Sequence, residues 1–431
     1  KDAQSRVMLC VDGVLPWRTN SKTTSSSRTF HFGRKPFGFG PRCLLAAVCP
    51  VVVYQRRGKQ RLVAFARHSR GLCEALLEWL QDIPGVEGLG GLRVGQSTYE
   101  AGGLGVFAAK DFAAGELVCR VPREALLLSG DGGAESLAEA YLRERSSPSS
   151  PFKPYWDSLP EDKDVAPFHP LQWPAELQQM EYVNDLLKGS LSAQRIFQER
   201  LKWASASPEM KAALVLVDSR SFNLADDQGN VIRALVPLID LLNTFVPLTS
   251  TGSWNCWFRG NLQEGALLQA ECPITEGSEL VHCYSDFSSP ELWATYGFLP
   301  LEAMESSHEA PLISLPLGEL KLISQAKKIL QPRHWLDERT LAFEIPWDAE
   351  DGGPLFTVLN CMANGQQDRV QNILRERLQT ALLASQQAEE ALLAPTSGPH
   401  AAFKAALQQA ALQLLHNERP LLEEELELLE G

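Results

Sequence analysis

Residues 235–300 read LVPLIDLLNTFVPLTSTGSWNCWFRGNLQEGALLQAECPITEGSELVHCYSDFSSPELWATYGFLP, and this stretch decides the fold. It opens with an apolar run that stops at Asp240 and Asn243, and it closes with Tyr284 and Tyr296 on either side of a turn-rich loop. Glycines and prolines separate three strand-like pieces between these ends, at residues 253–258, 266–270 and 279–284. Polar side chains at the turns of a segment so rich in buried-type residues predict a site that holds a ligand.

The composition is that of a soluble globular protein. The chain has 431 residues, enough for two or three domains, with 44% hydrophobic and 22% charged residues. Its net charge of −13 hides an asymmetry, since residues 1–73 carry 14 Lys and Arg against two acids, and the rest carries 26 bases against 51 acids. An acidic main body repels phosphates, so we expect a protein partner rather than a nucleic acid.

The basic leader, residues 1–73, does not resemble a folded domain. It is rich in arginine and nearly free of acids, which is typical of a transit peptide and makes a plastid location an expectation, with the cytoplasm or nucleus as the alternative. A disordered basic tail and a wrongly predicted gene start are the alternatives. The apolar run at residues 44–54 is too short to span a bilayer, so we expect no membrane association.

The nine cysteines lie at positions 10, 43, 49, 73, 119, 256, 272, 283 and 361. None of them forms a CxxC pair, so we expect no metal site. Their odd number and irregular spacing indicate reduced, mostly buried thiols.

A glycine motif, GLGVFA at residues 103–108, matches the GxGxxA pattern of dinucleotide-binding folds. That interpretation requires a helix to begin at the glycines, so that its amides face the phosphates. The following AAKDFAAGE is too short for such a helix and leads through Gly115-Glu116 into a second strand at residues 117–121. The glycines instead favour close approach of the backbone to some other ligand.

Helical periodicity dominates the regions on either side of residues 235–300. Four helices are expected between residues 134 and 234, and the last of them ends at SRSF, residues 219–222, just before an acidic turn. Beyond Pro300 the chain is rich in Ala, Leu and Gln, which predicts long amphipathic helices that pack together or hold a protein partner.

Five matching pieces, in order, identify a resemblance to SET-domain protein methyltransferases of the Rubisco large-subunit methyltransferase and actin-histidine methyltransferase class. The pieces are GLGVFA at 103–108 with GE at 115–116 and VP at 121–122; YWDSLP at 155–160; SRSF at 219–222; VPLIDLLN at 236–243; and SPEL at 289–292 leading into YGF at 296–298. The resemblance covers residues 75–430 and implies an α+β fold. We expect a SET domain of small twisted sheets at residues 74–305, with a helical insert at about 130–234, and an all-α substrate-binding domain at residues 306–431.

The resemblance also implies S-adenosylmethionine as cofactor, a protein substrate and a monomer. Tyr284 matches the catalytic tyrosine, Arg220 the arginine near the cofactor's carboxylate, and Asn243 the asparagine that holds the methionine moiety and adenine. The cofactor-binding residues that it implies are Gly103, Leu104, Gly105, Arg220, Asp240, Asn243, Thr244, Tyr284 and Phe298. The implied substrate channel consists of Ser221, Phe222, Trp254 and Tyr296, and core packing is the alternative for at least one of Trp254 and Trp257.

Methyl transfer to nitrogen needs a neutral amine. At a pH of about 8, a lysine with a pKa near 10.4 is mostly protonated, and its deprotonation costs about 2.4 pKa units, or roughly 3 kcal/mol. A dry aromatic channel favours the deprotonated amine, so no His or Glu base is required.

These residues favour lysine methylation of a folded non-histone protein, with Rubisco or another plastid protein as the expected substrate. Histidine methylation and a catalytically silent binding module are the alternatives. Thr244, where relatives usually have His, motivates the silent module, and Ser285-Asp286 also departs from the glycine common after the catalytic tyrosine.

Overall fold

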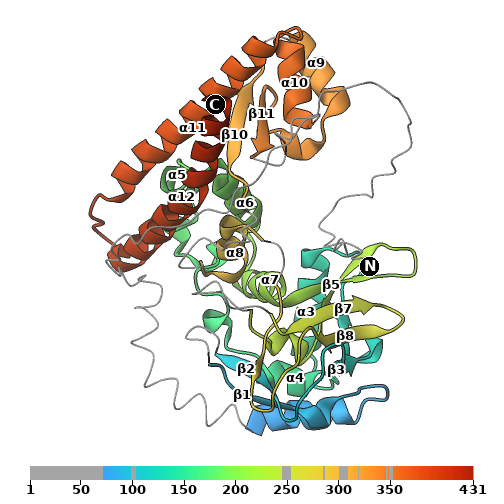
Figure 1. The fold of residues 1–431 in the computed structure, drawn as a ribbon. Helices are drawn as coiled ribbons and strands as arrows, with labels where there is room; N and C mark the ends of the chain where they lie inside the picture. Colours follow the sequence, from blue (N-terminus) through green and yellow to red (C-terminus); the bar gives the residue numbers. More distant parts are fainter. Residues whose placement is uncertain are drawn as a thin grey trace, which may run out of the picture. The chain divides into compact units, whose positions relative to one another are not determined.

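The computed structural model describes residues 71–98, 103–244, 254–284, 287–299, 309–318, 320–345, 348 and 353–430 (Figure 1). Nearly all of the basic leader, the Ser285-Asp286 pair and the expected domain boundary at residue 305 lie outside these residues. The described part begins with a helix over residues 71–81, as the apolar spacing there predicts, and Leu76 and Leu80 of this helix are fully buried.

A small antiparallel sheet contains the glycine motif. Its strand order is β1 (Leu92–Gln96), β2 (Leu104–Ala108) and β9 (Glu279–Leu280), with Gly95 opposite Gly105 and Phe107 opposite Glu279. The motif therefore continues as a strand and not as a helix, which confirms the rejection of a dinucleotide site. A Cβ at Gly105 would lie 2.3 Å from Oε1 of Glu279, so a side chain at this position would displace that carboxylate from its place.

A six-stranded sheet forms the second layer, in the order β3-β8-β7-β5-β6-β4. The strands are β3 (Leu117–Val121), β4 (Leu127–Leu128), β5 (Ser221–Ala225), β6 (Val231–Leu235), β7 (Cys256–Asn261) and β8 (Gly265–Ala270). The predicted strands at residues 117–121 and 266–270 are both present. Val118, Val121, Leu268 and other inward side chains of this sheet belong to one buried core, which explains why β8 is almost continuously apolar.

Most of the α-helices of this region lie between β4 and β5. They are α3 (Ala134–Ser146), α4 (Lys153–Ser158), α5 (Met180–Leu186), α6 (Leu191–Leu201), α7 (Pro208–Arg220) and, after β9, α8 (Ser289–Tyr296). The expected helical insert needs a correction at its end, because residues 221–235 form the β5–β6 hairpin, in which Ala225 pairs with Val231 around the acidic turn. The β-branched and aromatic residues of this segment fit a strand better than a helix.

The C-terminal region is helical, as expected, with one correction. It contains α9 (Leu320–Ile329), α10 (Pro354–Met362), α11 (Gln367–Leu392) and α12 (Ala401–Glu430), of which α11 and α12 lie side by side (Figure 1). It is not purely α, because β10 (Leu312–Pro316) pairs antiparallel with β11 (Thr340–Glu344). The apolar side of this ladder, including Ile313 and Phe343, packs into the same buried cluster as the helices. Within the described residues, no helix has both the length and the apolar character needed to cross a bilayer.

Candidate active site

Asn243 lies where the apolar run of residues 235–242 meets the small sheet. Leu238 has a strained backbone conformation, with a φ of 73°. The short η6 helix (Ile239–Leu241) lies between Leu238 and Asn243. Asn243 then bridges to Val281, and its carbonyl accepts a hydrogen bond of 3.1 Å from the N–H of His282. Its side-chain Nδ2 donates to the carbonyl of Leu104 (3.0 Å) and to Oε1 of Glu279 (2.9 Å).

Arg220, at the C-terminus of α7, faces Asp240. Its Nη1 donates to the backbone carbonyl of Asp240 (2.9 Å) and forms an ion pair of 3.6 Å with Oδ2 of the carboxylate. The hydroxyl of Tyr155 donates to the same Oδ2 (2.7 Å). Burial raises the pKa of Asp240 to about 6, although Arg220 and Tyr155 oppose that rise. Nε of Arg220 and Oδ1 of Asp240 are buried without a hydrogen-bond partner, so a donor and an acceptor remain for a ligand.

Tyr284 follows β9 and is half-buried beside this pair. Its hydroxyl donates to the carbonyl of Leu242 (3.1 Å), which directs the phenol towards the segment that carries Asn243. Burial raises the pKa of Tyr284 to about 12, while the charge of Arg220 and a hydrogen bond with the Thr244 backbone oppose this. The phenol therefore stays protonated at any ordinary assay pH.

Aromatic rings continue from Tyr284 in both directions. The ring of Tyr296 lies 4.6 Å from it and the imidazole of His282 lies 5.2 Å away, measured between centroids. Phe222 stacks on His282 at 5.5 Å, and Phe298 lies 6.0 Å from Tyr296. Burial raises the pKa of Tyr296 well above its ordinary value and lowers the pKa of His282 to about 4, so the row of rings is uncharged.

The Tyr-Gly-Phe motif turns the chain at the end of α8. Gly297 has a φ of 75°, in the left-handed region that favours glycine, and a Cβ there would lie 3.0 Å from the backbone nitrogen of Phe168. Glycine therefore ends the helix between Tyr296, whose ring contacts Tyr284, and Phe298, whose ring contacts Tyr296. At the other end of α8, the N–H of Ser288 donates to the carboxylate of Glu291 (2.8 Å).

Most of the predicted residues fall in one place. Asn243, Thr244, Arg220, Asp240, Tyr284 and Tyr296 are joined by the contacts above, and Phe222 and Phe298 extend the row of rings. Ser221 begins β5 opposite Leu235, beside Arg220 in the chain. Gly103 has a φ of 60°, and none of the described residues has an atom within 4 Å of where a Cβ would lie.

The two tryptophans differ in burial. Trp254 is half-buried with an unpartnered indole nitrogen, and within the described residues it makes no ring contact with Tyr284 or Tyr296. Trp257 is 38% exposed, so it is not a core residue. Strand alternation explains this, because Trp257 points away from the core that Cys256 and Phe258 face.

Glu279 is a site residue that sequence reasoning missed. It is buried in β9, and its carboxylate accepts hydrogen bonds from Asn243 Nδ2 and Ser97 Oγ, and from both the backbone N–H and the hydroxyl of Thr98. An acid among the apolar residues of SELVHCY was the available signal, but Asn243 lies 36 residues earlier in the chain, and Ser97 lies 182 residues earlier.

Asp218 is the second missed residue. It is buried on α7, two residues before Arg220, and its Oδ2 lies 2.5 Å from Nε of Arg200 and 3.3 Å from Nε2 of His169. Arg200 also donates to the hydroxyl of Thr295, the residue before Tyr296 (3.0 Å). Burial alone would raise the pKa of Asp218, but Arg200, His169 and Arg233 together hold it below its usual range. This ionic network connects the helix that carries Arg220 to the helix that carries Tyr296.

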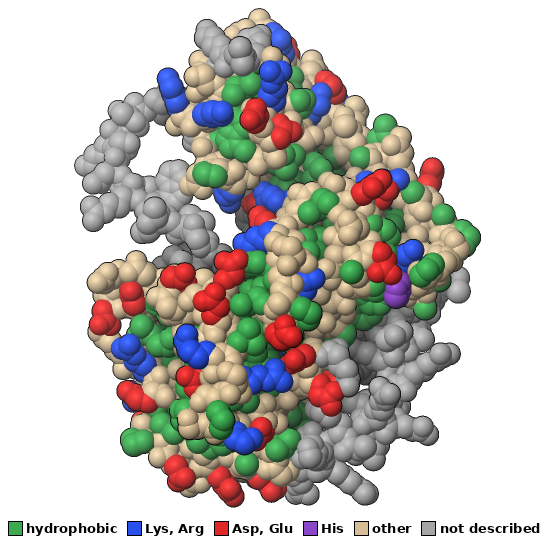
Figure 2. Space-filling model, turned by 180° about the vertical axis from the view of Figure 1, so that it is seen from behind, with side chains coloured by type: hydrophobic (Ala, Val, Ile, Leu, Met, Phe, Trp, Pro, Cys, Tyr) green, Lys and Arg blue, Asp and Glu red, His purple; other side chains and the backbone are tan. Residues whose placement is uncertain are grey.

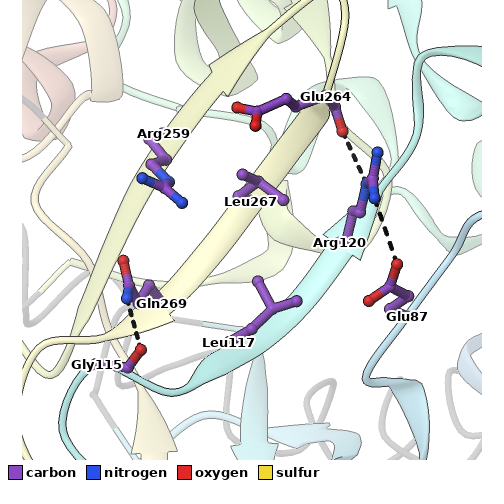
Figure 3. A pocket seen from close by; sticks show the side chains of 8 residues that line it. All are labelled: Glu87, Gly115, Leu117, Arg120, Arg259, Glu264, Leu267 and Gln269. Atoms are coloured by element: carbon purple, nitrogen blue, oxygen red, sulfur yellow. Dashed lines mark hydrogen bonds and ion pairs between the residues drawn. The ribbon is translucent and has the colours of Figure 1, made fainter.

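A separate hollow lies on the outer face of the six-stranded sheet (Figure 3). It is lined by Glu87, Gly115, Leu117, Arg120, Arg259, Glu264, Leu267 and Gln269, none of which is a predicted site residue. Arg120 is already bound there by Glu87 (3.4 Å) and by the carbonyl of Glu264 (2.9 Å). On the molecular face in Figure 2, acidic and basic side chains are interspersed with hydrophobic ones. Among the described residues, no group of three or more His, Cys, Asp or Glu side chains is arranged to hold a metal ion.

Comparison with solved structures identifies the fold as the SET fold, which confirms the α+β class expected from the sequence. The SET domain of LSMT bound to lysine and AdoHcy matches with a TM-score of 0.54 and 17% identity, over 84% of this chain and 92% of that chain. Rubisco LSMT bound to AdoMet matches with a TM-score of 0.51 and 18% identity, over 83% and 93%. Rubisco LSMT bound to sinefungin and monomethyllysine matches with a TM-score of 0.52, also at 18% identity over 83% and 93%. No protein-family model and no curated protein matches the chain.

Proposed function

We propose that this protein is an S-adenosylmethionine-dependent protein-lysine N-methyltransferase that acts on a folded non-histone protein. The observation that carries the proposal is the position of Tyr284. Its hydroxyl donates to the carbonyl of Leu242, the residue before Asn243, and its ring contacts the ring of Tyr296. The SET fold is shared with LSMT structures that contain AdoMet, AdoHcy, lysine or methyllysine, and this supports the same reaction class.

The residues present fit the amino-acid end of the cofactor. The unpartnered Nε of Arg220 is a donor for its carboxylate. Both protons of Asn243 Nδ2 are used by Leu104 and Glu279, so Oδ1 of Asn243 remains as an acceptor for its ammonium group. Asp240 holds Arg220, and the backbone around Gly103, Leu104, Gly105 and Thr244, with the rings of Tyr284 and Phe298, would complete the site. When bound, the cofactor supplies an electrophilic methyl group on a sulfonium.

The side chains of the chain itself prepare the acceptor amine. The uncharged rings of Phe222, Tyr284 and Tyr296 exclude water and so favour the neutral form of a lysine amine. Tyr284 keeps its proton because its pKa is about 12, and its hydroxyl orients the amine for in-line attack. The basic charge of residues 1–73 supports a plastid location, with Rubisco or another plastid protein as substrate.

Calorimetric titration of the protein with S-adenosylmethionine tests the proposal against a silent binding module. We expect saturable heat with one site per chain, because the unpartnered groups of Arg220 and Asn243 await a zwitterionic ligand. Thr244 forms its hydrogen bond with Tyr284 through the backbone and not through the side chain. A threonine in place of the usual His should therefore not abolish cofactor binding. Absence of heat up to millimolar cofactor would rule out methyl transfer by this site.

A further inference from the structure

The orientation of the Asn243 side chain is fixed by its neighbours. The two groups that face its amide nitrogen, the carbonyl of Leu104 and the carboxylate of Glu279, are both acceptors. If the amide were turned round, its oxygen would face two other oxygens, so only one of the two orientations is satisfied. Of these two acceptors, the Leu104 carbonyl is a neutral backbone group of β2, and the Glu279 side chain is a carboxylate.

Glu279 is itself held in place from several directions. Oε1 accepts from Ser97 Oγ (2.7 Å) as well as from Asn243, and Oε2 accepts from the N–H (2.7 Å) and the hydroxyl (2.6 Å) of Thr98. The backbone of β9 is fixed as well, since Asn255 Nδ2 donates to the Glu279 carbonyl (2.8 Å) and Asn255 Oδ1 accepts from the N–H of Val281 (2.9 Å). The carboxylate is thus bound by four neutral donors from two segments of the chain, residues 97–98 and Asn243.

Gly105 gives the carboxylate the room it needs. A Cβ on Gly105 would lie 2.3 Å from Oε1 of Glu279 and 3.3 Å from Nδ2 of Asn243. Gly105, the second glycine of the motif, therefore lets the backbone of β2 approach the side chains of Glu279 and Asn243 closely. Glycine, glutamate and asparagine form one packed unit that links β2, β9 and the segment after η6.

We propose that Glu279 is a positioning residue for the methyl donor: its carboxylate, itself held by residues 97–98, locks the Asn243 amide so that Oδ1 faces the bound ligand. The proposal rests on the proposed function of this site. Glu279 does not touch the reacting atoms, so its loss should weaken donor binding much more than it slows the chemical step.

Glu279→Gln tests this role with little change in volume. A glutamine has one oxygen where the carboxylate has two, so its NH2 must face either Asn243 or Thr98, both of which donate. We expect the calorimetric Kd for S-adenosylhomocysteine to rise about tenfold or more, because a charge-assisted hydrogen bond is replaced by opposed donors. At saturating S-adenosylmethionine, kcat should stay within about threefold of the wild-type value. Glu276→Gln is the matched control, since Glu276 is an exposed acid in the turn before β9, and its Kd should not change.

A double-mutant cycle with Asn243→Ala separates positioning from general destabilisation. If Glu279 acts through Asn243, Glu279→Gln should change the Kd by less than about twofold in the Asn243→Ala protein. An unchanged Kd for Glu279→Gln, or an equal loss in both backgrounds, would overturn the proposal. If Glu279→Gln does not fold, as judged by circular dichroism, Thr98→Val replaces it in the cycle. That variant keeps the carboxylate and should weaken binding by about twofold to fivefold, again only when Asn243 is present.

The failures of the two proposals are distinguishable. Wild-type protein that binds no S-adenosylhomocysteine and transfers no methyl group contradicts the proposed function. Wild-type protein that does both, with Glu279→Gln indistinguishable from it, contradicts only the role of Glu279.

Discussion

Replacing Tyr284 with phenylalanine is expected to lower kcat for methyl transfer by about 100-fold or more, the size of effect seen when one oriented hydrogen-bond donor is removed from an active site. The ring would keep its place against Tyr296, 4.6 Å away, so only the hydroxyl is lost. Because Arg220, Asn243 and Glu279 remain, the Kd for S-adenosylhomocysteine should stay within about threefold. Steady-state rates with labelled S-adenosylmethionine and calorimetry on the same protein measure the two quantities.

Tyr182→Phe is the matched control for this variant. Tyr182 is a half-buried tyrosine on α5 that packs against a different buried cluster, so its removal should leave kcat unchanged. The pH profile provides a second check. Since the pKa of Tyr284 is about 12, a rise in rate between pH 7 and 10 should report deprotonation of the acceptor amine and not of the phenol. A Tyr284→Phe protein that methylates as fast as the wild type would contradict the catalytic assignment.

Replacing Asp218 with alanine is expected to lower the free energy of unfolding by about 3–5 kcal/mol, because it removes one partner of a buried ionic network. Arg200 and Arg233 would lose their carboxylate, at 2.5 and 3.8 Å. Nδ1 of His169 accepts from the N–H of Leu171, so the proton is on Nε2, which would face no acceptor. Denaturant unfolding of wild-type and variant proteins measures the difference.

Asp227→Ala is the control for the network, since Asp227 is an exposed acid in the β5–β6 turn. We expect it to change the unfolding free energy by less than about 0.5 kcal/mol. An Asp218→Ala protein as stable as the wild type would show that the buried charges are solvated in some other way. Because Arg200 also binds Thr295, loss of Asp218 should further weaken the hold on Tyr296 and reduce activity.

The strands could be predicted because their signals are local, whereas the grouping of the site residues depended on the resemblance. The turn at Gly115-Glu116 fixes the start of β3, and glycines and prolines bracket β8. Asn243 and Tyr284 lie 41 residues apart and were brought together only by the resemblance to SET-domain proteins. In the structure the Tyr284 hydroxyl is hydrogen-bonded to the backbone of the two residues next to Asn243, Leu242 and Thr244.

The missed features depend on contacts between distant segments. Glu279 has the composition of a solvent-facing residue in a strand, and its burial follows only from donors at Ser97, Thr98 and Asn243. Asp218 likewise appears as one acid on an apolar helix until Arg200 and His169 are brought to it. The β10–β11 ladder was hidden because TLAFE and LISLP are short apolar pieces between strongly helical segments, and periodicity does not separate strand from helix at that length.

The most direct test of the account is transfer of a labelled methyl group from S-adenosylmethionine to proteins of a plastid or cell extract, followed by mapping of the modified residue. We predict label on a lysine Nζ of a folded protein, dependent on Tyr284 and absent when the extract is denatured. Label on a histidine would keep the fold and cofactor assignment and overturn the lysine specificity. Calorimetric binding of the cofactor without transfer to any protein would contradict the assignment of this site as a methyltransferase.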